Sequence, residues 1–335
     1  MPSSRRTFLG SVGVAAAASA VTAALPVAAN GAGKAAREKS PTPAASKQLY
    51  YVAAPTPCDK SLKFDDGLYK DMLTYYKEKG ADGIVVLGTT GEFPSFSAPE
   101  RRKVAETALK HRNGLRIIVQ PGTSNEPETV ELATHAEANG ADGLLVIPPF
   151  YYKNPPFDGL VKYYSAVFDA VKIPVHLYHI PGTSAVPITH ELLHAMEKYP
   201  HLAGIKDSTG DAAGYQKFVE TFPKLNMMSG TENNLKPALL AGMGAILAGG
   251  VFVGETAAVF AAHRAGQDLE APLAKLRAAS QLLRPGGIGA YGPMKFALAQ
   301  RMGSRQAFQR PPFVDVTEEQ KSVIAAKLAE LKQQA

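Results

Sequence analysis

Short apolar segments alternate with longer amphipathic ones along most of the chain. Runs of four or five apolar residues are typical of strands buried on both faces, and the stretches between them carry apolar residues at helical spacing. Eight such strands alternating with helices predict a parallel (β/α)8 TIM barrel with a helical C-terminal extension. The expected strands are 49–53, 83–87, 116–120, 143–147, 175–178, 203–206, 226–229 and 245–248. The expected helices are 66–79, 98–112, 127–139, 157–171, 189–198, 211–222, 233–241, 255–266, 272–283, 291–302 and 317–333.

An internal repeat supports this architecture. Residues 80–86 (GADGIVV) recur as residues 140–146 (GADGLLV), and a fainter copy follows at 242–248 (GMGAILA). The first glycine of each copy is expected to end a helix, and the apolar run is expected to form the next buried strand. The spacing between the first two copies holds two strand–helix units, each of a length typical of such barrels.

The N-terminal region differs in composition from the rest. Residues 1–29 combine the pair Arg5-Arg6 with a weakly apolar, Ala-rich run and small residues at its end, which predicts a cleavable twin-arginine export signal and a periplasmic or secreted protein. Residues 30–47 are rich in Gly, Ala, Pro, Ser and Lys and predict a flexible linker. The barrel is then expected over 48–252, with the closing helix and the C-terminal extension over 253–335.

Composition excludes several other functions. The chain has 36 Lys and Arg against 30 Asp and Glu, a net charge of +6 that is spread without a basic run, so we expect no nucleic-acid partner. No segment of the mature chain reads as a membrane span. Cys58 is the one cysteine and has no partner for an internal disulfide.

The chemistry is expected at Lys206, where an apolar strand meets the turn Asp-Ser-Thr-Gly. Burial disfavours the charged form of a lysine, and a neutral amine can attack a ketone to form a Schiff base. The alternative is that Lys206 reaches solvent or pairs with Asp207.

Other polar groups are expected at the same mouth, because the active site of such a barrel lies at the carboxyl ends of its strands. A lysine, tyrosines, hydroxyls and exposed backbone N–H groups suit 2-oxo acid chemistry, in which a protonated imine accepts electrons, a phenol–hydroxyl relay moves protons and a Gly-rich turn holds the carboxylate. No cofactor is needed for this chemistry. The residues expected there are Thr89, Thr90, Gly91, Tyr152, Tyr178, Lys206, Ser208, Gly230, Glu232 and Gly249.

Three motifs in order resemble one family. Residues 88–92 (GTTGE), Tyr178 shortly before Pro181, and residues 204–207 (GIKD) are similar to the dihydrodipicolinate synthase/N-acetylneuraminate lyase family, over about residues 49–331. The resemblance implies a TIM barrel, a lyase and a substrate such as pyruvate.

The same resemblance implies individual roles. Lys206 would form the Schiff base and Tyr178 would be the catalytic tyrosine. Thr89 and Thr90 would bind the pyruvyl carboxylate, with Thr90 also in the proton relay. Tyr152 would match a tyrosine that, in the synthase, a neighbouring subunit contributes, which implies a homo-oligomer, either a tetramer or a dimer. Plain aromatic packing in its Pro-rich loop is the alternative for Tyr152.

Departures from the family pattern bear on the substrate. Thr183 stands where the synthase has an arginine that holds the second substrate's carboxylate, Asn233 replaces one acid of a pair that binds sugar hydroxyls in the lyase, and Gly249 replaces a hydroxyl of that lyase. We therefore expect reversible aldol cleavage of a 4-hydroxy-2-oxo acid to pyruvate and an aldehyde. The alternatives are condensation of pyruvate with aspartate semialdehyde by a dihydrodipicolinate synthase, dehydration of a 2-oxo sugar acid, and an exported 2-oxo acid binding protein without turnover.

A metal site is not expected. His190 and His194 are four apart on a predicted helix, but no acid is placed to complete a site. Among the histidines, only His179, next to Tyr178, is expected near the pocket.

Overall fold

The computed structural model describes residues 48–282 and 290–333, all within one compact unit. The predicted export signal (1–29) and linker (30–47) lie outside the described residues. Within the described ranges, no helix combines the length and the apolar character needed to cross a bilayer.

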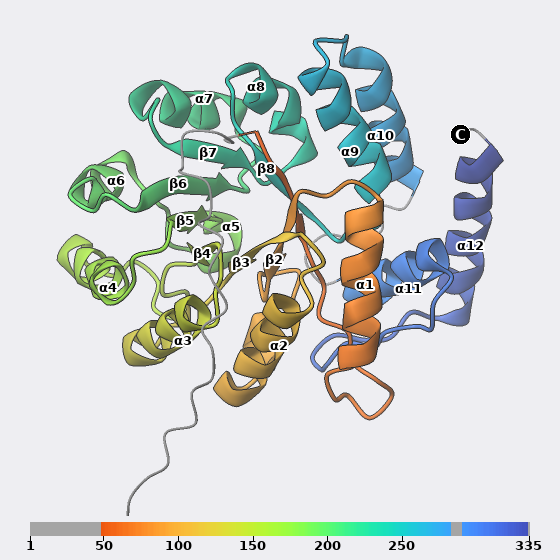
Figure 1. Cartoon of the computed structure of the whole chain (residues 1–335), viewed down its shortest axis with the longest axis horizontal. Helices are drawn as coiled ribbons and strands as arrows, with labels where there is room; N and C mark the ends of the chain where they lie inside the picture. Colours follow the sequence, from red (N-terminus) through yellow and green to blue (C-terminus); the bar gives the residue numbers. More distant parts are fainter. Residues whose placement is uncertain (1–47, 283–289, 334–335) are drawn as a thin grey trace, which may run out of the picture. The chain divides into compact units, whose positions relative to one another are not determined.

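Eight parallel strands form a closed barrel in sequence order, with β8 pairing β1 (Figure 1). This confirms the predicted TIM barrel. Nearly all strand residues are buried, because the barrel interior covers one face and the surrounding helices cover the other, which explains the continuous apolar runs. The strands are β1 (Tyr50–Ala53), β2 (Gly83–Val86), β3 (Arg116–Val119), β4 (Gly143–Val146), β5 (Val175–His179), β6 (Leu202–Asp207), β7 (Asn226–Ser229) and β8 (Ala245–Ala248).

The helices agree with the expected ones within a few residues at their ends. The glycines that begin the three repeat copies, Gly80, Gly140 and Gly242, have φ values of 90°, 87° and 77°, so each ends its helix in the left-handed conformation as predicted. The α-helices are α1 (Asp66–Glu78), α2 (Ala98–Lys110), α3 (Glu126–Ala138), α4 (Phe157–Ala170), α5 (Pro181–Ser184), α6 (His190–Met196), α7 (Ala212–Thr221), α8 (Leu235–Leu240), α9 (Val253–Arg264), α10 (Glu270–Leu282), α11 (Tyr291–Met302) and α12 (Glu318–Gln333).

Three local details differ from the prediction. Strand β6 continues through Asp207, one residue beyond Lys206. The expected helix 233–241 is divided into a short 3-10 helix, Glu232–Asn234, and α8. Helix α5 was not predicted, because four residues are too few to show a helical period.

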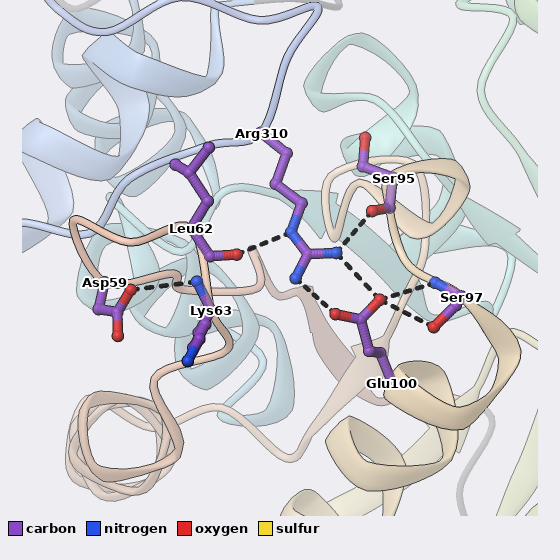
Figure 2. A network of polar contacts seen from close by, with 7 residues as sticks. All are labelled: Asp59, Leu62, Lys63, Ser95, Ser97, Glu100 and Arg310. Atoms are coloured by element: carbon purple, nitrogen blue, oxygen red, sulfur yellow. Dashed lines mark hydrogen bonds and ion pairs between the residues drawn. The ribbon is translucent and has the colours of Figure 1, made fainter.

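Arg310 joins the segment after α11 to two loops that are distant in sequence (Figure 2). Its Nε donates to the carbonyl of Leu62 at 2.9 Å and its Nη1 to the carbonyl of Ser95 at 2.8 Å. Its guanidinium also forms two bonds, at 3.0 and 2.6 Å, with the carboxylate of Glu100, which in turn caps α2 through Ser97. The C-terminal extension is therefore fixed to the loops that precede α1 and α2.

The hydrogen bonds from Arg310 lower the pKa of Glu100 to about 2. A folded-state pKa below the unfolded value of about 4.5 stabilises the protein above that pH, and the contribution is lost as the pH falls towards 2. Because Glu100 is 40% exposed, we expect Glu100→Gln to lower the free energy of unfolding by only about 1 kcal/mol at neutral pH.

Urea unfolding at several pH values measures this contribution. The difference between wild type and Glu100→Gln should shrink by more than half between about pH 5 and pH 3. Glu318→Gln is the control, since that carboxylate is 88% exposed beside Lys321 and should contribute little. Equal stabilities of wild type and Glu100→Gln at neutral pH would contradict the assignment.

Candidate active site

A cavity of about 690 Å³ lies at the carboxyl ends of the strands. Its walls come from the loops after β2, β5, β6, β7 and β8 and from α11. Of the residues predicted for the site, those in its walls are Thr89, Thr90, Tyr178, Thr183, Lys206, Ser208, Gly230, Glu232 and Gly249. Gly91 and Tyr152 are not among them.

Lys206 and Tyr178 form the centre of the site. They face each other across neighbouring strands, because β5 and β6 pair in register with Tyr178 opposite Lys206. The lysine is only 5% exposed, its Nζ donates to the Tyr178 phenol oxygen at 3.3 Å, and it lies 4.5 Å from the centre of the tyrosine ring. The alternative of a solvent-directed lysine is therefore excluded in this structure.

Tyr178 is a more acidic phenol than usual. Burial is the largest single influence and would raise its pKa, but the charge of Lys206 and hydrogen bonds with Thr89, Ser208 and Lys206 together outweigh it and lower the pKa. The hydroxyl of Thr89 donates to the phenol oxygen at 3.4 Å, so this oxygen accepts hydrogen bonds from both Thr89 and Lys206. As a phenolate, an oxygen so placed can take a proton from the Lys206 ammonium and pass it on to substrate.

The 88–92 turn presents backbone N–H groups. Leu87 has a φ of 59°, and the turn closes with bonds from Gly91 N to Gly88 O (2.9 Å) and from Glu92 N to Thr89 O (3.0 Å). Within the described part of the chain, the amides of Thr89 and Thr90 donate to no acceptor. Successive free N–H groups in such a turn form a typical binding place for a carboxylate.

Gly91 lets the turn pack closely against Leu87 and does not line the cavity. A side chain there would bring its Cβ within 2.9 Å of the Cα of Leu87. Its carbonyl accepts from the hydroxyl of Thr56 at 2.8 Å. The close approach of the backbone therefore explains why this position requires glycine, and no contact with a substrate is needed.

Glu92, the last residue of the turn, is buried in an ion pair with Lys295 of α11, with 2.5 Å between Oε1 and Nζ. Burial raises the pKa of Glu92 and lowers the pKa of Lys295, and in both cases the partner's charge opposes the shift. Lys295 also donates to the carbonyl of Phe308 at 2.7 Å. The pair joins the turn to the C-terminal extension.

Tyr291 is a cavity residue that the sequence analysis missed. It begins α11, is 6% exposed, and donates its phenol hydrogen to the carbonyl of Thr89 at 3.0 Å. Burial, with smaller contributions from Glu92 and Tyr178, raises its pKa to about 12, so it remains a neutral donor. An aromatic residue at the start of a C-terminal helix was the only sequence signal for it.

Tyr152 lies outside the cavity. It is 66% exposed on the loop after β4, and its ring packs edge-to-face against that of Tyr151, which is 73% exposed. A role for Tyr152 in catalysis therefore requires a second copy of the chain.

The remaining wall combines a few polar groups with apolar side chains such as Ile180 and Phe252. Thr183 of α5, Ser208 and Glu232 contribute oxygen atoms, while Met294 fills the space above Gly249, where a Cβ would lie 2.8 Å from the sulfur. Among the described residues that line the cavity, Lys206 is the only lysine or arginine.

The expectation for His179 was wrong. It is adjacent to Tyr178 on β5, so its side chain points to the opposite face of the strand, towards the helices. Its Nδ1 accepts from the amide of Ile188 at 3.0 Å, and its ring lies against Phe218. Over the described ranges, no group of three or more His, Cys, Asp or Glu side chains is placed to hold a metal ion.

Comparisons with known proteins show the family of the chain. The sequence model of a family described as "Dihydrodipicolinate synthetase family" matches residues 48–331. An uncharacterized DapA-like lyase of Chloroflexus aurantiacus is 33% identical over 264 residues, covering 76% of this chain and 86% of that protein. A 4-hydroxy-tetrahydrodipicolinate synthase of Mycolicibacterium paratuberculosis is 38% identical over 175 residues, but the alignment spans only 52% of this chain and 57% of the synthase.

A solved structure also matches. It is a prophage protein of E. coli K12 belonging to the dihydrodipicolinic acid synthase family, in complex with pyruvate. Its TM-score is 0.77 at 26% identity, and the match covers 85% of this chain and 98% of that one.

Replacing Tyr178 by Phe tests the proton-transfer role of the phenol. The ring is kept and the hydroxyl removed, so we expect the rate at which Lys206 forms an imine with pyruvate to fall by about 10²–10⁴. The rate is measured by borohydride trapping and mass spectrometry. Tyr215→Phe, which removes another buried phenol bonded to a carbonyl, that of Met227, is the control and should keep the wild-type rate. An unchanged rate in Tyr178→Phe would show that another group moves the proton.

Proposed function

Because the chain belongs to the dihydrodipicolinate synthetase family, whose members are Schiff-base lyases, we propose that it cleaves a 4-hydroxy-2-oxo acid to pyruvate and an aldehyde. The observation that carries the proposal is the buried Lys206–Tyr178 pair beside the 88–92 turn. Among the described residues, the amides of Thr89 and Thr90 have no acceptor and the cavity lining holds no cation besides Lys206.

The reaction begins with proton transfer from the Lys206 ammonium to the Tyr178 phenolate, which leaves a neutral amine and a phenol. The amine attacks the C2 carbonyl of the substrate. The phenol then gives its proton to the departing carbinolamine hydroxyl, so loss of water leaves the protonated imine and the phenolate. The imine accepts the electrons of the C3–C4 bond as a base, Tyr178 through the hydroxyl of Thr89 or Thr90, removes the proton from the C4 hydroxyl. The aldehyde leaves, the enamine is protonated at C3, and hydrolysis of the imine releases pyruvate and restores Lys206.

The character of the aldehyde follows from charge. A carboxylate on the second partner would lie against Thr183, Ser208 and Glu232, and no guanidinium or ammonium of the described lining residues is placed beside them to receive it. A charge-assisted hydrogen bond contributes roughly 1.5–3 kcal/mol. At about 1.4 kcal/mol per tenfold, its absence disfavours a carboxylated aldehyde by about one to two orders of magnitude. We therefore favour a neutral aldehyde.

The synthase reaction, condensation of pyruvate with aspartate semialdehyde, is the second candidate. It is favoured by the 38% identity to a 4-hydroxy-tetrahydrodipicolinate synthase. Both candidates use the same pyruvyl imine. One cleaves a carbon–carbon bond and the other forms one, and the wall beside Thr183 receives a different partner in each.

Replacing Lys206 by Ala or Arg is expected to abolish turnover and to leave a folded protein. Arginine stays protonated at any working pH and cannot form the imine. With pyruvate and borohydride, the wild type should gain mass irreversibly at Lys206, and neither variant should. Lys236→Arg, a surface substitution in the pair with Glu270, is the control. Normal turnover in either Lys206 variant would contradict the mechanism.

A comparison of kcat/KM values separates the two reactions. We expect cleavage of 4-hydroxy-2-oxo acids that release neutral aldehydes to exceed condensation with aspartate semialdehyde. Thr183→Arg should raise the value for the carboxylated partner by about ten- to a hundredfold relative to the neutral ones, since it adds the missing charge. Efficient condensation by the wild type, with no cleavage of any substrate tested, would overturn the preference.

A further inference from the structure

Tyr291 fixes the backbone of the 88–92 turn. Its phenol donates to the carbonyl of Thr89 at 3.0 Å across 202 positions of sequence, and it stands in the cavity wall with Tyr178. The ring itself packs edge-to-face on Phe313, with 4.3 Å between centres. The side chain is thus held at its hydroxyl by the carbonyl of Thr89 and at its ring by Phe313.

The bond acts on one peptide unit. The carbonyl of Thr89 and the N–H of Thr90 belong to the same planar group, so fixing the oxygen also fixes the direction of the hydrogen. Donation to the carbonyl also polarises the unit and strengthens its N–H as a donor. That N–H has no acceptor within the described ranges, and it lies in the turn whose side chains line the cavity.

A second contact from the same helix holds the other end of the turn. Lys295 lies four residues after Tyr291, on the same side of α11, and pairs with Glu92. Gly292 packs this end of the helix closely against the C-terminal segment, since a Cβ there would lie 2.7 Å from the carbonyl of Val314. Helix α11 therefore contacts the turn at both Thr89 and Glu92.

We propose that Tyr291 is a positioning residue for carboxylate recognition: through the carbonyl of Thr89 it sets the Thr89–Thr90 peptide to bind the carboxylate of the 2-oxo acid. The assignment rests on the proposed function and adds a residue outside the motifs. It acts on the anionic end of the substrate and leaves the chemistry of Lys206 unchanged.

Two ketones separate these roles. Pyruvate and acetone both condense with the amine of Lys206 with loss of water, and borohydride delivers hydride to the imine carbon to give a stable secondary amine; only pyruvate has a carboxylate. Tyr291→Phe keeps the ring on Phe313 and removes the hydrogen bond. We expect the half-saturating pyruvate concentration in trapping to rise about three- to tenfold, and labelling by acetone to stay at the wild-type rate.

Tyr163→Phe is a matched control. Tyr163 is also 6% exposed, also lies on a helix, and also donates to a threonine carbonyl in a loop after a strand, that of Thr123 at 2.8 Å, but it does not line the cavity. It should leave the pyruvate-to-acetone ratio unchanged.

Melting temperatures of both variants report whether they fold. If Tyr291→Phe is unfolded, Phe313→Leu, which loosens the tyrosine ring but keeps its phenol, should show the same selective loss.

The outcomes are distinct. Wild-type protein that neither ketone labels contradicts the proposed function and this assignment with it. A labelled wild type with the same pyruvate half-saturation in Tyr291→Phe overturns this assignment alone. An equal loss for pyruvate and acetone also overturns it, because that result would report damage around Lys206 instead of carboxylate recognition.

Discussion

A buried amine beside a buried phenol is the interaction on which the site depends. Burying a charged amine or a polar phenol costs free energy. The contact between Lys206 and Tyr178 lowers that cost for both groups. The pairing register of β5 and β6 places the two residues opposite each other without any contribution from the loops. Strands buried on both faces cannot slip by one residue without turning this pair away from the cavity, so the barrel core itself protects the geometry.

The C-terminal extension holds several loops of the barrel in place. Tyr291 and Lys295 hold the turn after β2, and Arg310 holds the loops before α1 and α2. Leaving either Lys295 or Glu92 buried without its partner would cost several kcal/mol, on the order of 3–5. The pair therefore favours the one alignment of α11 and the turn in which both charges meet. The extension is therefore part of the active site, while the barrel supplies the reacting groups.

Sequence patterns predicted the barrel and most of the cavity, because both follow from local information. Apolar runs define buried strands, and strand ends in a parallel barrel converge, so Lys206, Tyr178 and Thr89 could be assigned to one place. His179 was misplaced because adjacency in sequence on a strand means opposite faces in space. Tyr291 and Lys295 were missed for a different reason: their partners are about two hundred residues earlier, and no periodicity reports such contacts.

The long separation between Thr89 and Tyr291 has a consequence for how the protein is made. The ribosome adds roughly 5–20 residues per second, so the turn leaves the ribosome on the order of ten to forty seconds before the tyrosine that holds its carbonyl. During that interval the strands before α11 can pair while the 88–92 turn lacks its contacts with Tyr291 and Lys295. The site is thus completed only after residue 291 has been synthesised. A chain that stops short of it retains Lys206 and Tyr178 but lacks the part of the cavity wall that α11 supplies.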